Sequence, residues 1–412
     1  MKLIFLNITI LFLTACSPST LSLSKVHLTT QKGLTQTLTT KERLKPYEEE
    51  SFIAHQPHLK VIRIYDGAGD NKTVITTYYP SGHIYQLLEC KNNQAFGLYK
   101  EWYANGKIKV IAHILGGSPE IEPTGNTSWI FDGESKAYDQ DGNIEASFNY
   151  ENGLLEKISL LYYPSGQIKK TLPYKNNLLH GQTVHYDQEE HILEKAHYNL
   201  GEREGASTLY WDRKILASDE KYLRGKLISG LYFNRVGKLM GQVQEGFGHK
   251  VVWLEDSSYK LVAFQSGTPE GLVNLFNSKG SLIHQYQQHL GVKDGEEVLF
   301  YSNTLQPKLS LTWSNGLLHG SIKSWYPSGT VESEREISQN KKHGLFRARY
   351  ENGDLMLLEE YDSDLLIKGE YFRKDSSFSC SSVASGEGTA CLFDSKGILL
   401  QKTDYQGGSP IE

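Results

Sequence analysis

Three histidines stand at the same place in different copies of a repeated pattern, each directly before a glycine: His180, His319 and His343. Imidazole is a common zinc ligand, so a recurring histidine would indicate a metal site if the side chains converged. If the copies are β-hairpins, equivalent residues lie two strands apart, at roughly 10 Å. That separation is too large for one ion, and we expect no metal site.

Paired carboxylates are the second candidates for chemistry. Glu189-Glu190 and Glu359-Glu360 are adjacent in sequence, and adjacent residues of a strand point to opposite faces of the sheet, so neither pair can act on one bond. The sequence also lacks the nucleophile elbow, phosphate-binding loop, dinucleotide fingerprint and zinc-protease motifs. We expect no catalytic residue and no cofactor, and we predict that the protein is not an enzyme.

Two cysteines near the C-terminus, Cys380 and Cys391, flank a single turn-rich loop. In an oxidising compartment they could form a disulfide between adjacent strands. The alternative is a pair of buried free thiols, and the sequence leaves both open. Cys90 has no obvious partner and is expected to be a small strand residue.

A fourth cysteine, Cys16, ends the hydrophobic N-terminal segment, which has one basic residue, Lys2, followed by an apolar run from Leu3 to Leu13. This is the composition of a signal-peptide core, and the run is too short for a mature membrane-spanning helix. The run ends in Leu-Thr-Ala-Cys, which resembles the lipobox of bacterial lipoproteins. The alternative is an ordinary secretory signal with a coincidental cysteine.

The lipobox resemblance implies that residues 1–15 are removed and that Cys16 becomes the lipidated N-terminus, carrying a diacylglycerol and an amide-linked acyl chain such as palmitate. Such chains anchor a protein stably without a transmembrane helix. In Gram-negative lipoproteins a residue other than Asp after the cysteine, here Ser17, implies transport to the outer membrane. We therefore expect a lipid-anchored protein of the cell envelope.

Residues 16–57 are rich in Ser, Thr, Lys and Glu and have no sustained apolar period. That composition is typical of a flexible tether between a lipid anchor and a folded body. The body is then expected to span residues 58–412.

The body is built on a repeated pattern: an aromatic pair, a turn ending in glycine, an aliphatic residue two positions later, and a second glycine about fifteen residues beyond the first. Its clearest copies are Tyr78–Ile84, Trp102–Ile108, Tyr162–Ile168 and Trp325–Val331. The turn glycines Gly82 and Gly106 are 24 residues apart, as are Gly142 and Gly166, and Gly329 and Gly353.

Two turn signals per copy indicate two strands, and Asn-Gly, Asp-Gly and Pro-Ser-Gly turns are typical of β-hairpins. We predict an all-β, elongated array of antiparallel hairpins in which each unit buries its apolar face only against its neighbours. Equivalent residues then stack in two ladders across the sheet. The aromatic ladder comprises Tyr78, Trp102, Tyr138, Tyr162, Tyr186, Phe233, Trp253, Phe276, Trp325 and Phe393, and the aliphatic ladder Ile84, Ile108, Ile144, Ile168, Ile192, Leu239, Leu282, Val331 and Leu355.

With its following glycine-containing turn, the unit Tyr-Tyr-x-x-Gly-x-Ile resembles the bacterial variant of the MORN repeat. Many bacterial chains of this type are grouped as YwqK-like antitoxin-family proteins, and the resemblance covers the chain from about residue 70 onward. It implies a single-sheet repeat solenoid. Copies at 251–262, 298–309 and 371–379 depart most from the pattern, because a turn glycine is lost or an insertion intervenes.

A further irregularity is the segment at 116–122, Gly-Gly-Ser-Pro-Glu-Ile-Glu, which is echoed by Gly-Gly-Ser-Pro-Ile-Glu at 407–412. Each copy is expected to replace the second turn of its unit. The simplest interpretation is an inserted or terminating loop, and the alternative is a peptide-docking motif.

The net charge of −5 is small, and 43 basic and 48 acidic residues are mixed along the chain, which argues against a nucleic-acid partner. We expect a membrane-anchored scaffold that binds a protein, glycan or lipid on its repeat surface, and an exposed aromatic stripe with a polar rim would favour it. An immunity role, in which the array blocks a toxin, is implied by the family grouping alone. A cell-wall enzyme is the third and weakest hypothesis, because no convergent titratable groups are evident.

Overall fold

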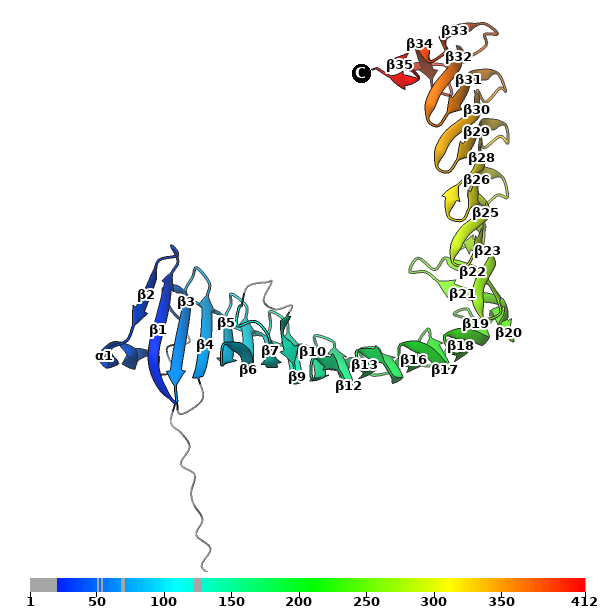
Figure 1. Cartoon of the computed structure of the whole chain (residues 1–412). Helices are drawn as coiled ribbons and strands as arrows, with labels where there is room; N and C mark the ends of the chain where they lie inside the picture. Colours follow the sequence, from blue (N-terminus) through cyan, green and yellow to red (C-terminus); the bar gives the residue numbers. More distant parts are fainter. Residues whose placement is uncertain (1–20, 50–51, 53–54, 68–70, 122–127, 412) are drawn as a thin grey trace, which may run out of the picture. The chain divides into compact units, whose positions relative to one another are not determined.

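The computed structural model describes residues 21–49, 52, 55–67, 71–121 and 128–411 (Figure 1). This part of the chain is nearly all β, and its helices are the single turn α1 (Lys41–Leu44) and the adjoining 3-10 turn η1 (Lys45–Tyr47). None of the described helices has the length and apolar character needed to cross a bilayer. The predicted signal peptide, residues 1–15, and the predicted lipid attachment residue, Cys16, lie outside the described residues.

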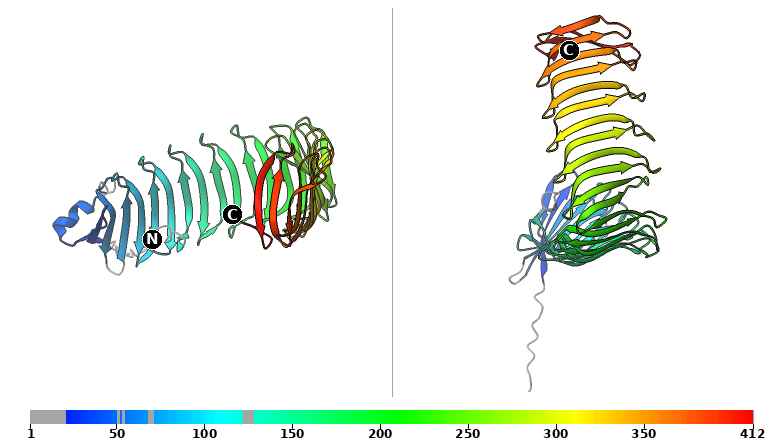
Figure 2. Two further views of the ribbon diagram at one scale, coloured as in Figure 1. Left: turned by 90° about the horizontal axis from the view of Figure 1, so that it is seen from above. Right: turned by 90° about the vertical axis from the view of Figure 1, so that its right-hand side faces the viewer.

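The chain divides into two compact units, residues 1–193 with 198–201 and residues 194–197 with 202–412. In unit 1, β1 lies between β2 and β3, and from β3 onward the strands follow one another in chain order with antiparallel pairing (Figure 2). Its strands are β1 (Ser22–Thr30), β2 (Thr35–Leu38), β3 (His58–Asp66), β4 (Asn71–Tyr78), β5 (Ile84–Lys91), β6 (Gln94–Trp102), β7 (Ile108–Gly116), β8 (Ile130–Phe131), β9 (Gly133–Tyr138), β10 (Ile144–Glu151), β11 (Leu154–Leu155), β12 (Lys157–Tyr162), β13 (Ile168–Lys175), β14 (Leu178–Leu179) and β15 (Gly181–Tyr186). Strand β16 (Ile192–Asn199) contributes residues to both units.

Unit 2 continues the same meander of antiparallel hairpins. Its strands are β17 (Glu202–Tyr210), β18 (Leu216–Leu223), β19 (Lys226–Phe233), β20 (Leu239–Gln244), β21 (Phe247–Trp253), β22 (Tyr259–Gln265), β23 (Thr268–Phe276), β24 (Leu282–His289), β25 (Val292–Phe300), β26 (Pro307–Ser314), β27 (Leu317–Leu318), β28 (Gly320–Trp325), β29 (Val331–Ser338), β30 (Lys341–Arg349), β31 (Leu355–Asp362), β32 (Leu365–Phe372), β33 (Ser379–Ala384), β34 (Glu387–Phe393), β35 (Leu399–Gln406) and β36 (Ser409–Pro410). The predicted all-β array of antiparallel hairpins is confirmed.

Tight two-residue turns form one edge of each unit, as the sequence predicts. Both central residues have positive φ, for example 51° and 66° at Asn176-Asn177 and 52° and 83° at Asn152-Gly153. This is the type I′ geometry that matches the twist of paired strands and favours asparagine and glycine. The turns are also linked to one another, since Gly153 N–H donates to Phe131 O at 2.8 Å.

Longer turns form the opposite edge, and the residue after the ladder aromatic decides how each is held. Where it is tyrosine, its hydroxyl donates to a strand-end carbonyl of the next hairpin, as Tyr163 does to Tyr186 O at 2.7 Å. Where it is Asp or Asn, the side chain caps its own turn, as Asp139 does for the N–H of Asn143 at 2.8 Å. The second aromatic of the repeat therefore links one hairpin to the next.

The two predicted ladders face each other across these longer turns. Trp102 pairs with Ile108, Tyr162 with Ile168, and Phe276 with Leu282. A one-residue bulge precedes each pair, so the aromatic and the aliphatic residue come into register after the turn.

The flexible tether predicted for residues 16–57 is wrong over the part that the structure describes. Strand β1 pairs with β3 along its length, and its residues Val26 and Leu28 are buried. Leu44 of α1 and Phe52 pack on the same cluster. The polar composition misled the prediction because only alternate residues of β1 face the core, and a period of two is easily hidden among Ser, Thr and Lys.

The Gly-Gly-Ser-Pro segments share a glycine carbonyl that accepts a hydrogen bond. Gly117 O accepts a hydrogen bond from Ala95 N–H at 3.0 Å, and Gly408 O accepts one from Leu366 N–H at 2.9 Å. Ala95 lies near the start of β6, one tight turn back along the chain, and Leu366 lies near the start of β32, two tight turns back. Gly407 and Gly408 form the tight turn between β35 and β36, whereas the first segment leaves β7 for a loop of which residues 122–127 lie outside the described residues.

In the structure Cys380 and Cys391 are free, the first exposed and the second half-buried. Strands β33 and β34 are paired only next to their turn, at Val383–Gly388 and Ala384–Glu387, so they separate before they reach the cysteines. Cys380 Sγ lies 3.3 Å from Tyr371 O instead. The alternative of two buried thiols is incorrect, because Cys380 is exposed.

Candidate functional site

A hollow of about 350 Å³ opens at the long-turn edge of unit 2, within the size range of small-molecule sites. Its walls are the aromatic side chains of Trp211, Trp253 and Tyr259, and we call it the aromatic pocket. It lies where the repeat departs most from its pattern.

The local sequence explains why aromatic side chains gather there. Trp211 occupies the second aromatic position of its repeat, directly after β17, and its Nε1 donates to Phe233 O at 2.9 Å, as the tyrosines do elsewhere. Trp253 ends β21 and pairs with Tyr259 of β22. Tyr259 thus replaces the aliphatic residue that normally faces the ladder aromatic.

The rings are in mutual contact. Trp211 and Trp253 meet edge to face with centroids 4.9 Å apart, and Trp253 and Tyr259 are 5.2 Å apart. Tyr259 stacks on Phe276 at 4.9 Å with an interplanar angle of 15°. Pairs of this kind stabilise by about 0.5–1.5 kcal/mol beyond their buried area, so the walls are rigid.

The rim of the aromatic pocket is cationic and polar. The Arg235 guanidinium lies 4.4 Å from the centre of the Trp211 ring, a cation–π contact. Lys279, Ser257 and Ser278 add polar groups, and no acidic side chain is among the described residues that line the hollow. Val236, also on the rim, is 85% exposed.

Burial affects two polar groups of the aromatic pocket. The Trp253 Nε1–H is shielded from solvent and has no hydrogen-bond partner. Burial raises the pKa of the Tyr259 hydroxyl, so this group stays neutral and can donate.

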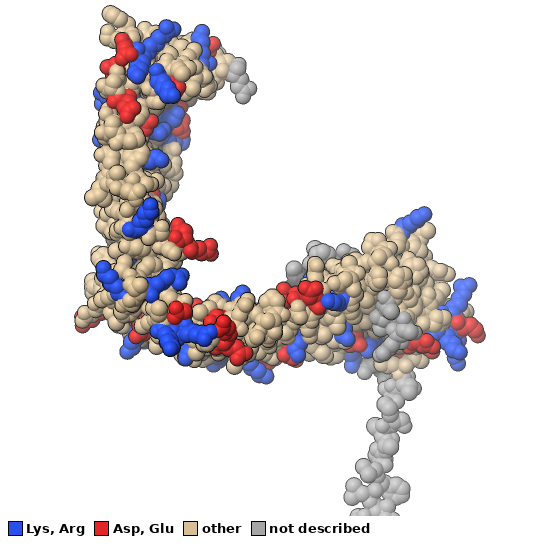
Figure 3. All heavy atoms as spheres, turned by 180° about the vertical axis from the view of Figure 1, so that it is seen from behind, with Lys and Arg blue, Asp and Glu red and all other residues tan. Residues whose placement is uncertain are grey.

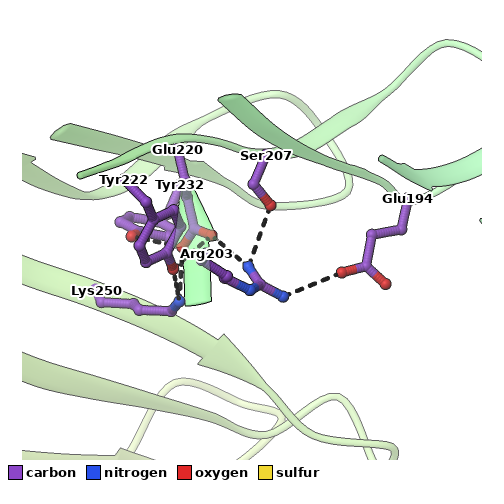
Figure 4. A network of polar contacts seen from close by, with 7 residues as sticks. All are labelled: Glu194, Arg203, Ser207, Glu220, Tyr222, Tyr232 and Lys250. Atoms are coloured by element: carbon purple, nitrogen blue, oxygen red, sulfur yellow. Dashed lines mark hydrogen bonds and ion pairs between the residues drawn. The ribbon is translucent and has the colours of Figure 1, made fainter. Parts of the chain in front are cut away.

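A buried polar network holds the strands behind the aromatic pocket (Figure 4). Its centre is Glu220 of β18, whose side chain is 4% exposed. Oε1 accepts from Tyr232 Oη at 2.8 Å and pairs with Lys250 Nζ at 2.7 Å, and Oε2 accepts from Tyr222 Oη at 3.0 Å. Arg203 pairs with Oε2 at 3.4 Å.

Electrostatics in this network favour the ionised pair. Burial lowers the pKa of Lys250, but Glu220 and Tyr222 together raise it by more, so the net shift is upward. Burial and the same carboxylate raise the pKa of Tyr232 far above its usual range. Because four groups already occupy its oxygens, Glu220 has no lone pair for a substrate and holds four strands together instead.

The network is coupled to the aromatic pocket by packing. Tyr222 and Tyr232 belong to the core cluster on which Met240, Trp253 and Tyr259 are packed. Gly230 makes this possible, since an ideal Cβ there would lie 2.5 Å from Tyr232 Oη. The tyrosine passes over the glycine of its own strand to reach Glu220.

The same arrangement recurs later in unit 2. Glu359 of β31 accepts from Tyr361 Oη at 3.0 Å and from Tyr371 Oη at 2.8 Å, and Gly369 lies under the second tyrosine as Gly230 does. Gly388 pairs with β33 and β35 as Gly248 pairs with β20 and β22. Counting from these glycines, Ala390 stands where the first copy has Lys250.

The histidines singled out in the sequence do not converge. The backbone N–H groups of His180 and His319 donate within their own hairpins, to Pro173 O and Thr312 O. His343 lies 3.4 Å from Asp362 in an exposed pair. No cluster of three or more potential ligands occurs in the described part of the chain. Glu360 is exposed beside the buried Glu359, as expected for adjacent residues of a strand.

Comparison with known families identifies part of the repeat array. The model of the MORN repeat variant matches residues 97–114, 131–152, 155–176 and 318–338. The chain is therefore a MORN-like repeat protein. No curated protein matches the sequence significantly. The aromatic pocket lies outside the matched stretches, in repeats that have diverged.

Sequence reasoning placed Trp253 in the aromatic ladder but did not assign it or its neighbours to a site. The signals were present: the turn glycine is replaced in the segment 255–258, and Tyr259 stands at an aliphatic position. Neither shows by itself that Trp211, two hairpins away in sequence, would complete the walls.

Proposed function

We propose that this protein is a lipid-anchored, non-catalytic binding scaffold of the bacterial envelope, and that the aromatic pocket is its principal binding site. The observation that carries the proposal is the convergence of Trp211, Trp253 and Tyr259 around a hollow of about 350 Å³ with a cationic, polar rim. The repeat array supports it, because such arrays commonly present extended binding surfaces.

The lipid anchor rests on the lipobox at Cys16. Changing Cys16 to Ser should release the protein from the membrane fraction into the periplasm or medium, because the acyl chains supply the membrane affinity. Retention of the variant in the membrane fraction at the wild-type level would contradict the anchor.

The chemistry of the aromatic pocket favours a glycan. Flat aromatic walls suit the apolar faces of sugar rings, and the hydroxyls of Ser257 and Ser278 suit sugar oxygens. Outside the pocket, basic and acidic side chains are interspersed on the face shown in Figure 3. The protein would bind this glycan without changing it.

Calorimetric titration with N-acetylglucosamine oligomers tests the glycan assignment. Trp253→Ala should weaken binding by about 1–3 kcal/mol, the contribution of one aromatic stacking platform. Val236→Glu should weaken it too, because Val236 is 85% exposed on the rim, whereas Leu290→Glu is the matched control at 82% exposure away from the aromatic pocket. Equal affinity in all four proteins would contradict the site.

Toxin blocking is the alternative that the family grouping implies. It predicts a tight protein partner and no glycan affinity, so the same titration separates the two roles.

A further inference from the structure

A second hollow, of about 450 Å³, lies on the sheet of unit 1 and is distinct from the aromatic pocket. Its lining includes Arg63, Tyr65, Lys100 and Trp102, and we call it the Arg63 pocket. It is independent of both the lipid anchor and the glycan site proposed above.

Arg63 is placed unusually for a charged residue. It stands in the middle of β3, only 5% exposed, and the residues directly opposite it on the two neighbouring strands are Val26 and Val74. Its Nε is buried without a hydrogen-bond partner. Within the described residues, its guanidinium forms no ion pair.

The acidic residues nearby do not neutralise Arg63. Glu89 also lines the hollow, but its Oε1 pairs with Lys72 Nζ at 2.7 Å and its Oε2 accepts from Leu98 N–H at 3.0 Å. Burial raises the pKa of Glu89, but these two hydrogen bonds and the charges of Lys72 and His113 together lower it by more, so Glu89 stays an anion paired with Lys72. Glu48 is exposed at the rim.

The neighbouring Tyr78 supplies no counter-charge either. Its burial raises the pKa of the phenol well above the usual range, and the Arg63 guanidinium only partly offsets this. Lys72 and Lys100 are also in the lining; Lys72 is paired with Glu89, whereas Lys100 has no ion-pair partner among the described residues. A guanidinium in a largely buried side chain without a counter-charge is costly to maintain, and an anion bound in the hollow would supply that charge.

The other walls of the Arg63 pocket indicate which kind of molecule bears the anionic group. Trp102 and Tyr65 offer flat apolar surfaces, and Leu87 and Leu98 complete the wall. Guanidinium groups bind carboxylates and phosphates through paired hydrogen bonds. We propose that the Arg63 pocket binds a small anionic sugar, a sugar phosphate or a sugar acid, with its anionic group on Arg63 and its ring against Trp102.

Calorimetric titration of the purified exported chain tests the proposal, with glucose 6-phosphate and glucuronate as probes and with glucose and inorganic phosphate as the two halves of the ligand. The anionic sugars should bind, glucose should not, and inorganic phosphate should bind about tenfold more weakly because it lacks the ring. Phosphate binding as tight as that of the sugar esters would refute the role of the wall. Failure of both anionic sugars to bind at millimolar concentration would refute the site.

Two variants assign the anion contact. Arg63→Met keeps the aliphatic stem and should weaken binding by at least about tenfold, the loss of one charge-assisted contact. Arg43→Met, on the exposed face of α1, removes the same charge outside the hollow and should leave binding unchanged. Because Arg63 has no partner in the protein, its replacement should not lower the melting temperature.

Lys100→Met is a second test of the anion contact. Because Lys100 is only half-buried, this change should not disturb the fold. It should weaken binding of the anionic sugars while the fold is retained. Wild-type affinity in both Arg63→Met and Lys100→Met would overturn the proposal.

Discussion

The duplicated glutamate networks allow a prediction in which one copy is the control for the other. Tyr232 Oη donates to Glu220 Oε1 and Tyr371 Oη to Glu359 Oε1, both at 2.8 Å, and these tyrosines are 1% and 0% exposed. Changing either to Phe removes one hydroxyl and leaves the ring in place. The two copies differ in which groups still contact the carboxylate oxygen after the hydroxyl is removed.

In the first copy Glu220 Oε1 keeps Lys250 Nζ at 2.7 Å. In the second copy no cation is within ion-pair distance of Glu359 among the described residues. A hydrogen bond to a charged group contributes about 1.5–3 kcal/mol, and an abandoned buried acceptor costs the upper end of that range. We therefore expect about 1.5 kcal/mol for Tyr232→Phe and about 3 kcal/mol for Tyr371→Phe.

Hydrogen exchange with mass spectrometry measures the two sites separately in one protein, because it reports local opening free energies. Peptides from β18 and β19 report on the first copy, and peptides from β31 and β32 on the second. Equal losses, or a larger loss at Tyr232, would refute the argument that Lys250 shields the first carboxylate.

Three further outcomes follow from the structure. Gly230→Ala should cost about 2 kcal/mol in the same exchange experiment, because the new Cβ would displace the tyrosine hydroxyl above it. Without reductant, a maleimide should label the exposed Cys380 but not Cys90, whose thiol pKa burial raises to about 12; an unlabelled Cys380 would revive the disulfide. Hydrogen bonding to Glu270 raises the pKa of His289 and lowers that of Glu270, so the pair should be intact between those two values. The ion pair should weaken as the pH rises through the pKa of His289 or falls through the pKa of Glu270. An NMR titration in which Glu270→Gln leaves the His289 pKa unchanged would contradict this.

The repeat architecture could be predicted because its signals are local. Asn-Gly turns, the period of 24 residues and the facing ladders depend on residues a few positions apart, and the structure has them in register at Trp102–Ile108 and Tyr162–Ile168. The paired strands of the N-terminal segment could not be predicted, because β1 depends on a partner, β3, whose paired residues are 28 to 44 positions away.

The candidate sites could not be predicted from the sequence, for a related reason. The aromatic pocket needs Trp211 and Trp253 to meet across hairpins, and the Arg63 pocket is defined by what Arg63 lacks, namely an acid on either neighbouring strand. The separation of Cys380 from Cys391 likewise depends on how far β33 and β34 stay paired. Sequence patterns report spacing, whereas these features depend on three-dimensional register.

Site-specific photo-crosslinking in intact cells tests the central claim, an anchored scaffold that binds through its aromatic pocket, most directly. A benzophenone side chain at Val236, on the rim, is compared with one at Leu290, which is similarly exposed elsewhere in unit 2. The account predicts one dominant adduct from position 236, absent from position 290 and lost in the Cys16→Ser background. Equal adducts from both positions, or an unchanged adduct without Cys16, would contradict it.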